Sequence, residues 1–485
     1  MASVAPEVET GERLRTFLPS VEERKGLILS HALGLALFAE LALNIFDFQL
    51  PFTPANSIPI RLICIWLLID RTGRIGRLRL GVWDAIMLGF VFLTGVGCIV
   101  TTTMNPAVPV SFEDYRKFVG LFVNAYLYYI VVREGLNRRG FRPDIAVRWL
   151  IAGFTWSAAV GIMQTLGLFG ARSWSLIYSN ALLAFIRESD SSDNFASGTA
   201  AWWNSMALEM LVAFALVFGP TFLRRPKWWE WACGAMFMGA FIATQSRGGL
   251  MAFAACSLAT FGWYLYHKKY AMAVTVGAVV SVGVVVWVFA IFALKIEKFT
   301  DTLQGEKVKG SVYNQSISTR LQQQRQLIII GNQLPIFGTG PHFGARMVNQ
   351  WSSYTISGPT DTTYGFTFAQ FGILGLAFLT IMQAYMIAFV RSSTAYRPYA
   401  FAAFFVGVAF TVHGLVEFLL YSRTFMVMNV LVALAGATNL ATEKGLAPFK
   451  RLVKLVPNYT ALPKKKPPVP DLPPDLPPLA GQQGE

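Results

Sequence analysis

Residues 244–250 read Thr244-Gln245-Ser246-Arg247-Gly248-Gly249-Leu250, a short polar stretch between two apolar runs at about 229–244 and 250–266. Neither run suits a soluble helix, because each is apolar on all sides. The gap leaves room for only a tight turn, which places Arg247 at the edge of the hydrocarbon. A charge there is costly and usually has a partner or a function. The stretch therefore predicts two membrane helices joined by a functional turn.

Composition points the same way for the whole chain. Of 485 residues, 54% are hydrophobic and only 14% are charged, against about 45–50% and about 25% in soluble domains. The mean hydropathy is +0.47. The net charge of +14 falls in loops between apolar runs, which argues against a nucleic-acid partner. The four cysteines lie inside apolar runs without metal-site spacing, so we interpret them as core residues.

Apolar runs of about 20 residues predict an all-α polytopic membrane protein with about twelve transmembrane helices. The predicted spans are 27–46, 57–69, 81–101, 113–132, 146–169, 199–221, 229–244, 250–266, 270–294, 364–390, 399–421 and 424–441. Two connections are long, residues 170–198 and 295–363. The second contains apolar stretches at 327–330 and 334–337, which favour a partly helical loop.

Lysine and arginine occur in every second connection, and the short connections between them are nearly free of both. The positive-inside rule therefore predicts a multi-pass membrane protein with both termini in the cytoplasm. The predicted organisation is a cytoplasmic arm (1–26), nine spans (27–294), a periplasmic loop carrying site residues (295–363), three spans (364–441) and a basic, Pro-rich, disordered cytoplasmic tail (442–485).

This orientation places several polar residues toward the outer ends of their spans. They include Asn204 in the sixth span, His413 and Glu417 in the eleventh, and the turn residues Arg247 and Arg423. The i, i+4 spacing of His413 and Glu417 predicts that they share one helical face. Polar residues in spans usually face one another or water, so we expect a polar cavity open to the outside. Structural hydrogen bonding is an equally good interpretation of the His413–Glu417 pair.

The order of several motifs resembles the bacterial O-antigen ligase and the O-antigen and exopolysaccharide polymerase superfamily. These are Trp202-Trp203-Asn204-Ser205 at the sixth span, Ser246-Arg247-Gly248-Gly249 between the seventh and eighth, Ser318-Thr319-Arg320-Leu321 and Pro335-Ile336-Phe337-Gly338-Thr339-Gly340-Pro341-His342-Phe343 in the outer loop, and Phe371-Gly372-Ile373-Leu374-Gly375-Leu376 after it. The resemblance runs from about 30 to 441. It implies a metal-independent glycosyltransferase of GT-C-like architecture that uses a lipid-linked donor and lies in the bacterial inner membrane.

The sequence departs from this family at one position. The ligases carry a histidine, ten residues and then a glycine at the helix start after the loop. Counting back from Gly372 gives Asp361 instead, and His342 is out of register. This difference favours a polymerase of polysaccharide repeat units over a ligase that transfers glycan to lipid A core. An ordinary helix N-cap is the competing interpretation of Asp361.

Transfer from an undecaprenyl diphosphate expels a diphosphate, which needs positive charge where negative charge develops. Arginine binds phosphate bidentately and stays protonated, so we expect Arg247, Arg320 and Arg423 to bind the diphosphate. The acceptor hydroxyl needs a base, and Asp361 is the candidate. The predicted substrate-binding residues are Asn204, His342, His413 and Glu417.

We expect no cofactor or metal. The expected partners are the lipid-linked oligosaccharide, the growing polysaccharide, the bilayer, and flippase, chain-length or export proteins.

A secondary transporter with twelve spans is the second alternative. Asp70-Arg71-Thr72-Gly73-Arg74 resembles part of the major facilitator loop motif, but Trp66 replaces its leading glycine. The connection at 222–228 is short, whereas that class has its long loop there. Transporter sites also lie near the midplane between repeats, and we find no repeat.

Overall fold

The structure is a computed structural model. It describes residues 21–42, 49–50, 53–54, 58–70, 81–104, 112–136, 138, 140–170, 198–200, 203–222, 226–244, 246–278, 317–340, 362–391, 397–415, 419–420 and 423–440. These residues are almost entirely helical.

The long helices follow one another along the chain as α2 (Val21–Ala42), α3 (Ile58–Asp70), α4 (Val82–Met104), α5 (Phe112–Leu136), α6 (Pro143–Leu166), α9 (Trp203–Phe218), α10 (Trp228–Ala243), α11 (Arg247–Tyr266), α14 (Ile317–Gly331), α16 (Thr363–Ile387), α17 (Arg397–His413) and α18 (Arg423–Leu440). The 3-10 helices are η3 (Leu168–Gly170), η4 (Gly219–Phe222) and η5 (Ala388–Arg391). Two short strands, β1 (Gln49–Leu50) and β2 (Thr53–Pro54), pair antiparallel.

Every predicted span overlaps a helix in the described part of the chain, the ninth through helical residues 270–278. Among the described residues, five helices are long and apolar enough to cross a membrane, and three more are apolar but shorter. The all-α class is therefore confirmed, and the helices are consistent with a membrane protein. The number of spans stays a prediction.

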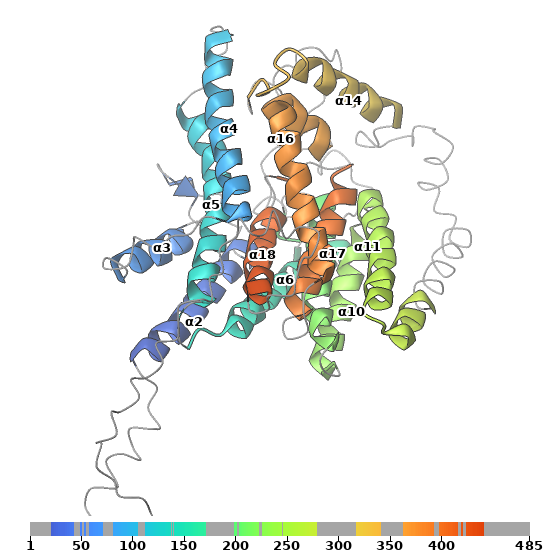
Figure 1. The fold of residues 1–485 in the computed structure, drawn as a ribbon. Helices are drawn as coiled ribbons and strands as arrows, with labels where there is room; N and C mark the ends of the chain where they lie inside the picture. The colour runs from blue at the N-terminus through green and yellow to red at the C-terminus, as the bar shows by residue number, and fades with distance from the viewer. Residues whose placement is uncertain are drawn as a thin grey trace, which may run out of the picture.

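The helices form one bundle with α14 at one end (Figure 1). That end is also where α4 ends and α5 begins, whereas α2 begins at the opposite end (Figure 1). Helix α17 packs against α11, α16 and α18, so it links the elements on either side of it.

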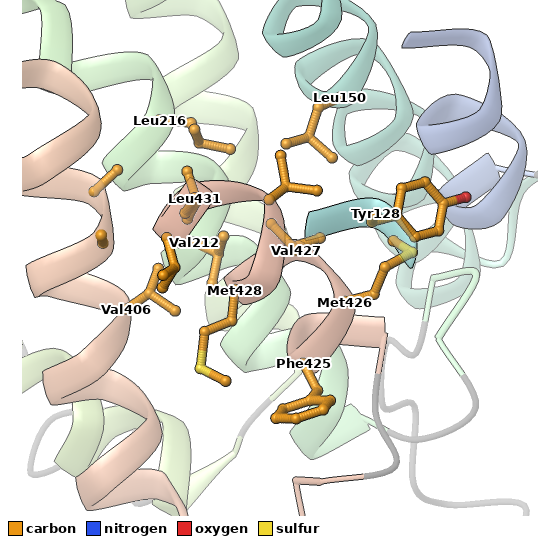
Figure 2. Packing of buried hydrophobic residues seen from close by; sticks show 14 of the residues in the cluster. Tyr128, Leu150, Val212, Leu216, Val406, Phe425, Met426, Val427, Met428 and Leu431 are labelled. Atoms are coloured by element: carbon orange, nitrogen blue, oxygen red, sulfur yellow. The ribbon is translucent and has the colours of Figure 1, made fainter. Parts of the chain in front are cut away.

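Helix α18 occupies the interior of the bundle. All its residues from 424 to 435 are buried, as expected for a helix that is apolar on all sides. Figure 2 shows its side chains among those of α5, α6, α9 and α17, with the labelled residues Tyr128, Leu150, Val212, Leu216, Val406, Phe425, Met426, Val427, Met428 and Leu431.

Other helices expose large apolar side chains on their outer faces. Leu35 of α2, Phe92 of α4 and Leu258 of α11 are all well exposed. All three helices are long and apolar enough to cross a membrane. These faces fit contact with lipid, in agreement with the composition of the chain.

Candidate active site

The turn between α10 and α11 is closed by its own side chains. The Thr244 hydroxyl donates to the carbonyl of Phe241 (2.7 Å), and Ser246 Oγ accepts the backbone N–H of Gly249 (3.0 Å). Ser246 is therefore the N-cap of α11, and Arg247 is its first residue. The predicted tight turn and helix start are confirmed. A capped helix N-terminus favours an anion nearby.

This turn is held against the first turn of α9. Ser246 Oγ donates to Asn204 Oδ1 at 2.7 Å. A Cβ added at Gly249 would lie 2.8 Å from the Cβ of Ala207, so α11 starts in close contact with α9. Asn204 therefore positions the turn that carries Arg247, and its predicted contact with substrate stays a prediction.

The remaining candidates are described only in part. Helix α14 contains Arg320, but the side chains of Arg247 and Arg320 lie outside the described part of the structure. Asp361, His342 and Glu417 lie outside the described residues altogether.

The predicted loop carries α14 against the first half of α16. Leu327 and Ile330 of α14 are buried with Phe366 and Ala369 of α16 in a small separate cluster. Arg320 lies two turns before Leu327 on the same helix. The structure thus packs the element that carries Arg320 against the helix that begins just after Asp361.

A break in α16 at Gly372 receives the segment that follows α14. In an unbroken helix the N–H groups of Ile373 and Leu374 would bond to the carbonyls four residues earlier. They bond instead to the carbonyls of Pro335 (2.8 Å) and Ile336 (3.4 Å), and the freed carbonyls accept the N–H groups of two loop residues, Thr339 to Ala369 (2.8 Å) and Gly340 to Gln370 (3.1 Å).

We call this contact of 335–340 with 369–374 the seam. Its backbone groups pair with one another, so the broken helix leaves them satisfied.

The glycines of the seam are required by geometry. Gly338, Gly340 and Gly372 have φ angles of 75°, 88° and 64°, which favour glycine. A Cβ at Gly372 would lie 2.4 Å from the carbonyl oxygen of Ile336, and one at Gly338 would lie 2.3 Å from the backbone of Gln370. The Pro-x-x-Gly-x-Gly pattern in the sequence therefore has a structural cause.

Replacing Gly372 or Gly338 by alanine should lower the free energy of unfolding by about 1–3 kcal/mol or more, because strain adds to a backbone clash. The measurement is the thermal unfolding midpoint of purified protein in detergent. Gly262→Ala is the matched control, since a Cβ there meets nothing within 4 Å. Equal midpoints for Gly372→Ala and Gly262→Ala would contradict this account of the seam.

The start of α16 is capped by Thr362, whose Oγ1 accepts the N–H of Gly365 at 3.2 Å. Asp361 is therefore not the N-cap, contrary to the ordinary explanation considered for it. The next N–H, of Thr363, donates to the carbonyl of Gly414 (2.8 Å), just past the end of α17. The first turn of α16 and the end of α17 are thereby joined.

His413 is the last residue of α17 and is fully buried. Its two ring nitrogens have no hydrogen-bond partner among the described residues. The predicted span reached 421, but α17 ends at His413 with a turn through Gly414. Glu417 lies outside the described residues, so the shared helical face of His413 and Glu417 stays a prediction.

Arg423, the first residue of α18, binds protein groups with every guanidinium nitrogen. Its Nε and NH2 donate to the two carboxylate oxygens of Glu209 in α9 (3.1 Å each), and NH1 donates to the carbonyls of Glu40 (3.2 Å) and Leu41 (2.9 Å) at the end of α2. Both terminal nitrogens also reach Thr199 Oγ1 at 3.3 Å. These contacts favour a positioning role, and diphosphate binding by Arg423 stays a prediction.

Sequence reasoning missed Glu209. It is the only acidic residue within the predicted span 199–221, and a carboxylate at that depth normally has a charged partner. That signal was available, although nothing in the sequence identified Arg423 as the partner.

Within the described residues, no group of three or more His, Cys, Asp and Glu is placed to hold a metal ion.

The helix ends described above contact one another in pairs. The starts of α9 and α11 are joined by Asn204 and Ser246, the start of α16 meets the end of α17, and the start of α18 meets the end of α2. The predicted site residues that the structure describes thus lie at neighbouring helix ends.

Comparison with known proteins finds a family match for part of the chain. The family model described as O-antigen ligase matches residues 231–380, which include the α10–α11 turn, α14, the seam and most of α16. A search of curated proteins finds no match. The match at 231–380 confirms the resemblance of the chain to the O-antigen ligase and polymerase superfamily.

Proposed function

We propose that the protein is a glycosyltransferase that polymerises polysaccharide repeat units of an exopolysaccharide or O-antigen. The donor is a glycan on a polyprenyl diphosphate and the acceptor is a sugar hydroxyl, at the periplasmic face. The family match over 231–380 supports glycosyl transfer in general, and Asp361 in place of the ligase histidine favours polymerisation over ligation. The capped helix start at Arg247, fixed through Ser246 and Asn204, supports glycosyl transfer as well.

In the proposed reaction the acceptor oxygen attacks the anomeric carbon of the donor glycan. The bond from that carbon to the diphosphate oxygen breaks, and polyprenyl diphosphate leaves. The acceptor proton passes to the carboxylate of Asp361. Arg247 and Arg320 stabilise the charge that develops on the leaving diphosphate, which is the general purpose of preorganised donors at such a site.

The proposed architecture is GT-C-like, with about twelve spans in the bacterial inner membrane and both termini in the cytoplasm. In this orientation residues 295–363 lie in the periplasm. The position of α14, at the end of the bundle opposite the start of α2, supports that orientation (Figure 1).

The product formed by purified protein from lipid-linked repeat units tests the proposal. A polymerase extends one repeat at a time and should yield a ladder of lipid-linked products without any other acceptor. A ligase should yield no ladder and should instead transfer glycan to lipid A core. The ligase alternative is retained because the matching family model is described as O-antigen ligase. Absence of transfer to either acceptor would overturn the glycosyltransferase proposal.

Asp361→Asn should lower the rate of repeat addition by about 10²-fold or more, within the range that general bases supply. The amide keeps the shape of the side chain but cannot accept the acceptor's proton. Because Thr362 is the N-cap of α16, the substitution should leave the helix start intact.

The readout is the initial rate at equal protein amount, with the thermal midpoint as control. A near-normal rate would remove Asp361 from the mechanism. It would leave His342, Glu417 and His413 as the next candidates.

A further inference from the structure

The end of α14 and the turn after it are apolar on two sides. Leu327 and Ile330 are buried against α16. A second set of apolar side chains points away from the protein, with exposed fractions of 46% for Ile328, 53% for Ile329, 55% for Ile336, 40% for Phe337 and 59% for Ile373 of α16. We call this second set the interfacial patch. The seam joins its parts, since Ile373 donates its N–H to Pro335.

The length of α16 gives the depth of the patch. The candidate span Thr363–Arg391 has 29 residues, which is longer than the roughly 20 residues that cross the hydrocarbon. Gly372 lies about 28 Å from Arg391 at 1.5 Å per residue, and the hydrocarbon is about 30 Å thick. With Arg391 at one boundary, the seam lies at the opposite boundary.

Non-helical backbone at this depth must have its polar groups satisfied by protein. The seam meets that condition, because the N–H groups of Thr339, Gly340, Ile373 and Leu374 all bond to carbonyls across it. The backbone of the turn can therefore lie at the edge of the hydrocarbon without an unpaired donor among these groups.

The charge on the exposed face of α14 suits a lipid surface. Arg325 is exposed and lies three and four residues before Ile328 and Ile329, so the three share one face. An interfacial helix typically combines apolar residues with basic residues that reach lipid phosphates. Continuity with Ile373, which lies on a candidate span, places this face beside lipid.

We propose that the interfacial patch is embedded in the outer leaflet of the bilayer and anchors α14 at the level of the lipid headgroups. Acyl chains cover Ile336, Phe337 and Ile373, and Arg325 reaches the phosphates. If the proposed function holds, this anchor also keeps α14, and with it Arg320, at the level of a lipid-linked diphosphate. The anchoring itself does not depend on that function.

The test is the depth of spin labels in the full-length protein in proteoliposomes of phosphatidylethanolamine and phosphatidylglycerol. Single cysteines replace Ile329, Ile336 or Phe337 in a background where the native Cys64, Cys98, Cys233 and Cys256 are serine or alanine. Accessibility to oxygen and to a water-soluble nickel complex is measured without substrate. Leu258→Cys, exposed on α11, calibrates lipid, and Lys269→Cys, exposed between helices, calibrates water.

We expect the labels at 329, 336 and 337 to favour oxygen over nickel several-fold more than the label at 269, and to approach the label at 258. Nickel accessibility like that at 269 would overturn the proposal, because the patch would face water. Exclusion of both reagents would also overturn it, because protein, including a second copy of the chain, would then cover the patch. Position 329 lies outside the seam and decides the matter if changes at 336 or 337 prevent folding.

Discussion

Arg247→Ala is expected to reduce glycan transfer by about 10²–10³-fold, the usual loss when one preorganised donor at a developing negative charge is removed. Arg247 is the first residue of α11, where the capped N-terminus already favours an anion. Alanine is a strong helix former, and the Ser246 cap does not depend on the arginine side chain. The variant should therefore fold and insert normally while losing activity.

Arg247→Lys should recover little of that loss, because a lysine ammonium lacks the planar fork that binds two phosphate oxygens. Arg320→Ala should show a loss of similar size if both arginines bind the diphosphate. The measurement is the rate of repeat addition from lipid-linked oligosaccharide, with product length as a second readout. Arg148→Ala is the matched control, since Arg148 is exposed on α6. Wild-type product from both Arg247→Ala and Arg320→Ala would contradict diphosphate binding by these two arginines.

Arg423→Ala is expected to lower the free energy of unfolding by about 3–5 kcal/mol, because removal of one partner leaves a buried charge uncompensated. The Glu209 side chain is only 1% exposed and pairs with Arg423 at 3.0 Å. The same substitution removes donors from the carbonyls of Glu40 and Leu41. The substitution therefore removes the contacts by which Arg423 of α18 holds α2 and α9.

The thermal midpoint in detergent measures this effect, and Arg391→Ala, at an exposed helix end, is the control. Combining Arg423→Met with Glu209→Leu should recover much of the midpoint, because a buried ion pair can often be replaced by apolar residues. A wild-type midpoint for Arg423→Ala together with lost transfer would contradict the positioning role. It would favour the predicted contact of Arg423 with diphosphate.

The glycines of the seam can be recognised in the sequence, but the contact that requires them cannot. The glycines at 338, 340 and 372 are visible in the sequence, and their pattern carried the resemblance. Their physical cause is the insertion of one segment into the broken helix of another, about 30 residues away. No local preference indicates which carbonyl a glycine must approach.

The sequence by itself determined where the helices lie, because a run of apolar residues several turns long indicates a helix surrounded by lipid or by protein core. It also determined the tight turn at Ser246-Arg247-Gly248-Gly249, since capping and glycine preferences act over three or four residues. Only the tertiary structure decided that Arg423 pairs with Glu209, 214 residues away, that Thr362 caps α16, and that α17 ends at His413. These outcomes depend on which polar groups come within hydrogen-bond distance when the helices pack. Hydropathy and spacing along the chain do not determine which groups approach one another in space.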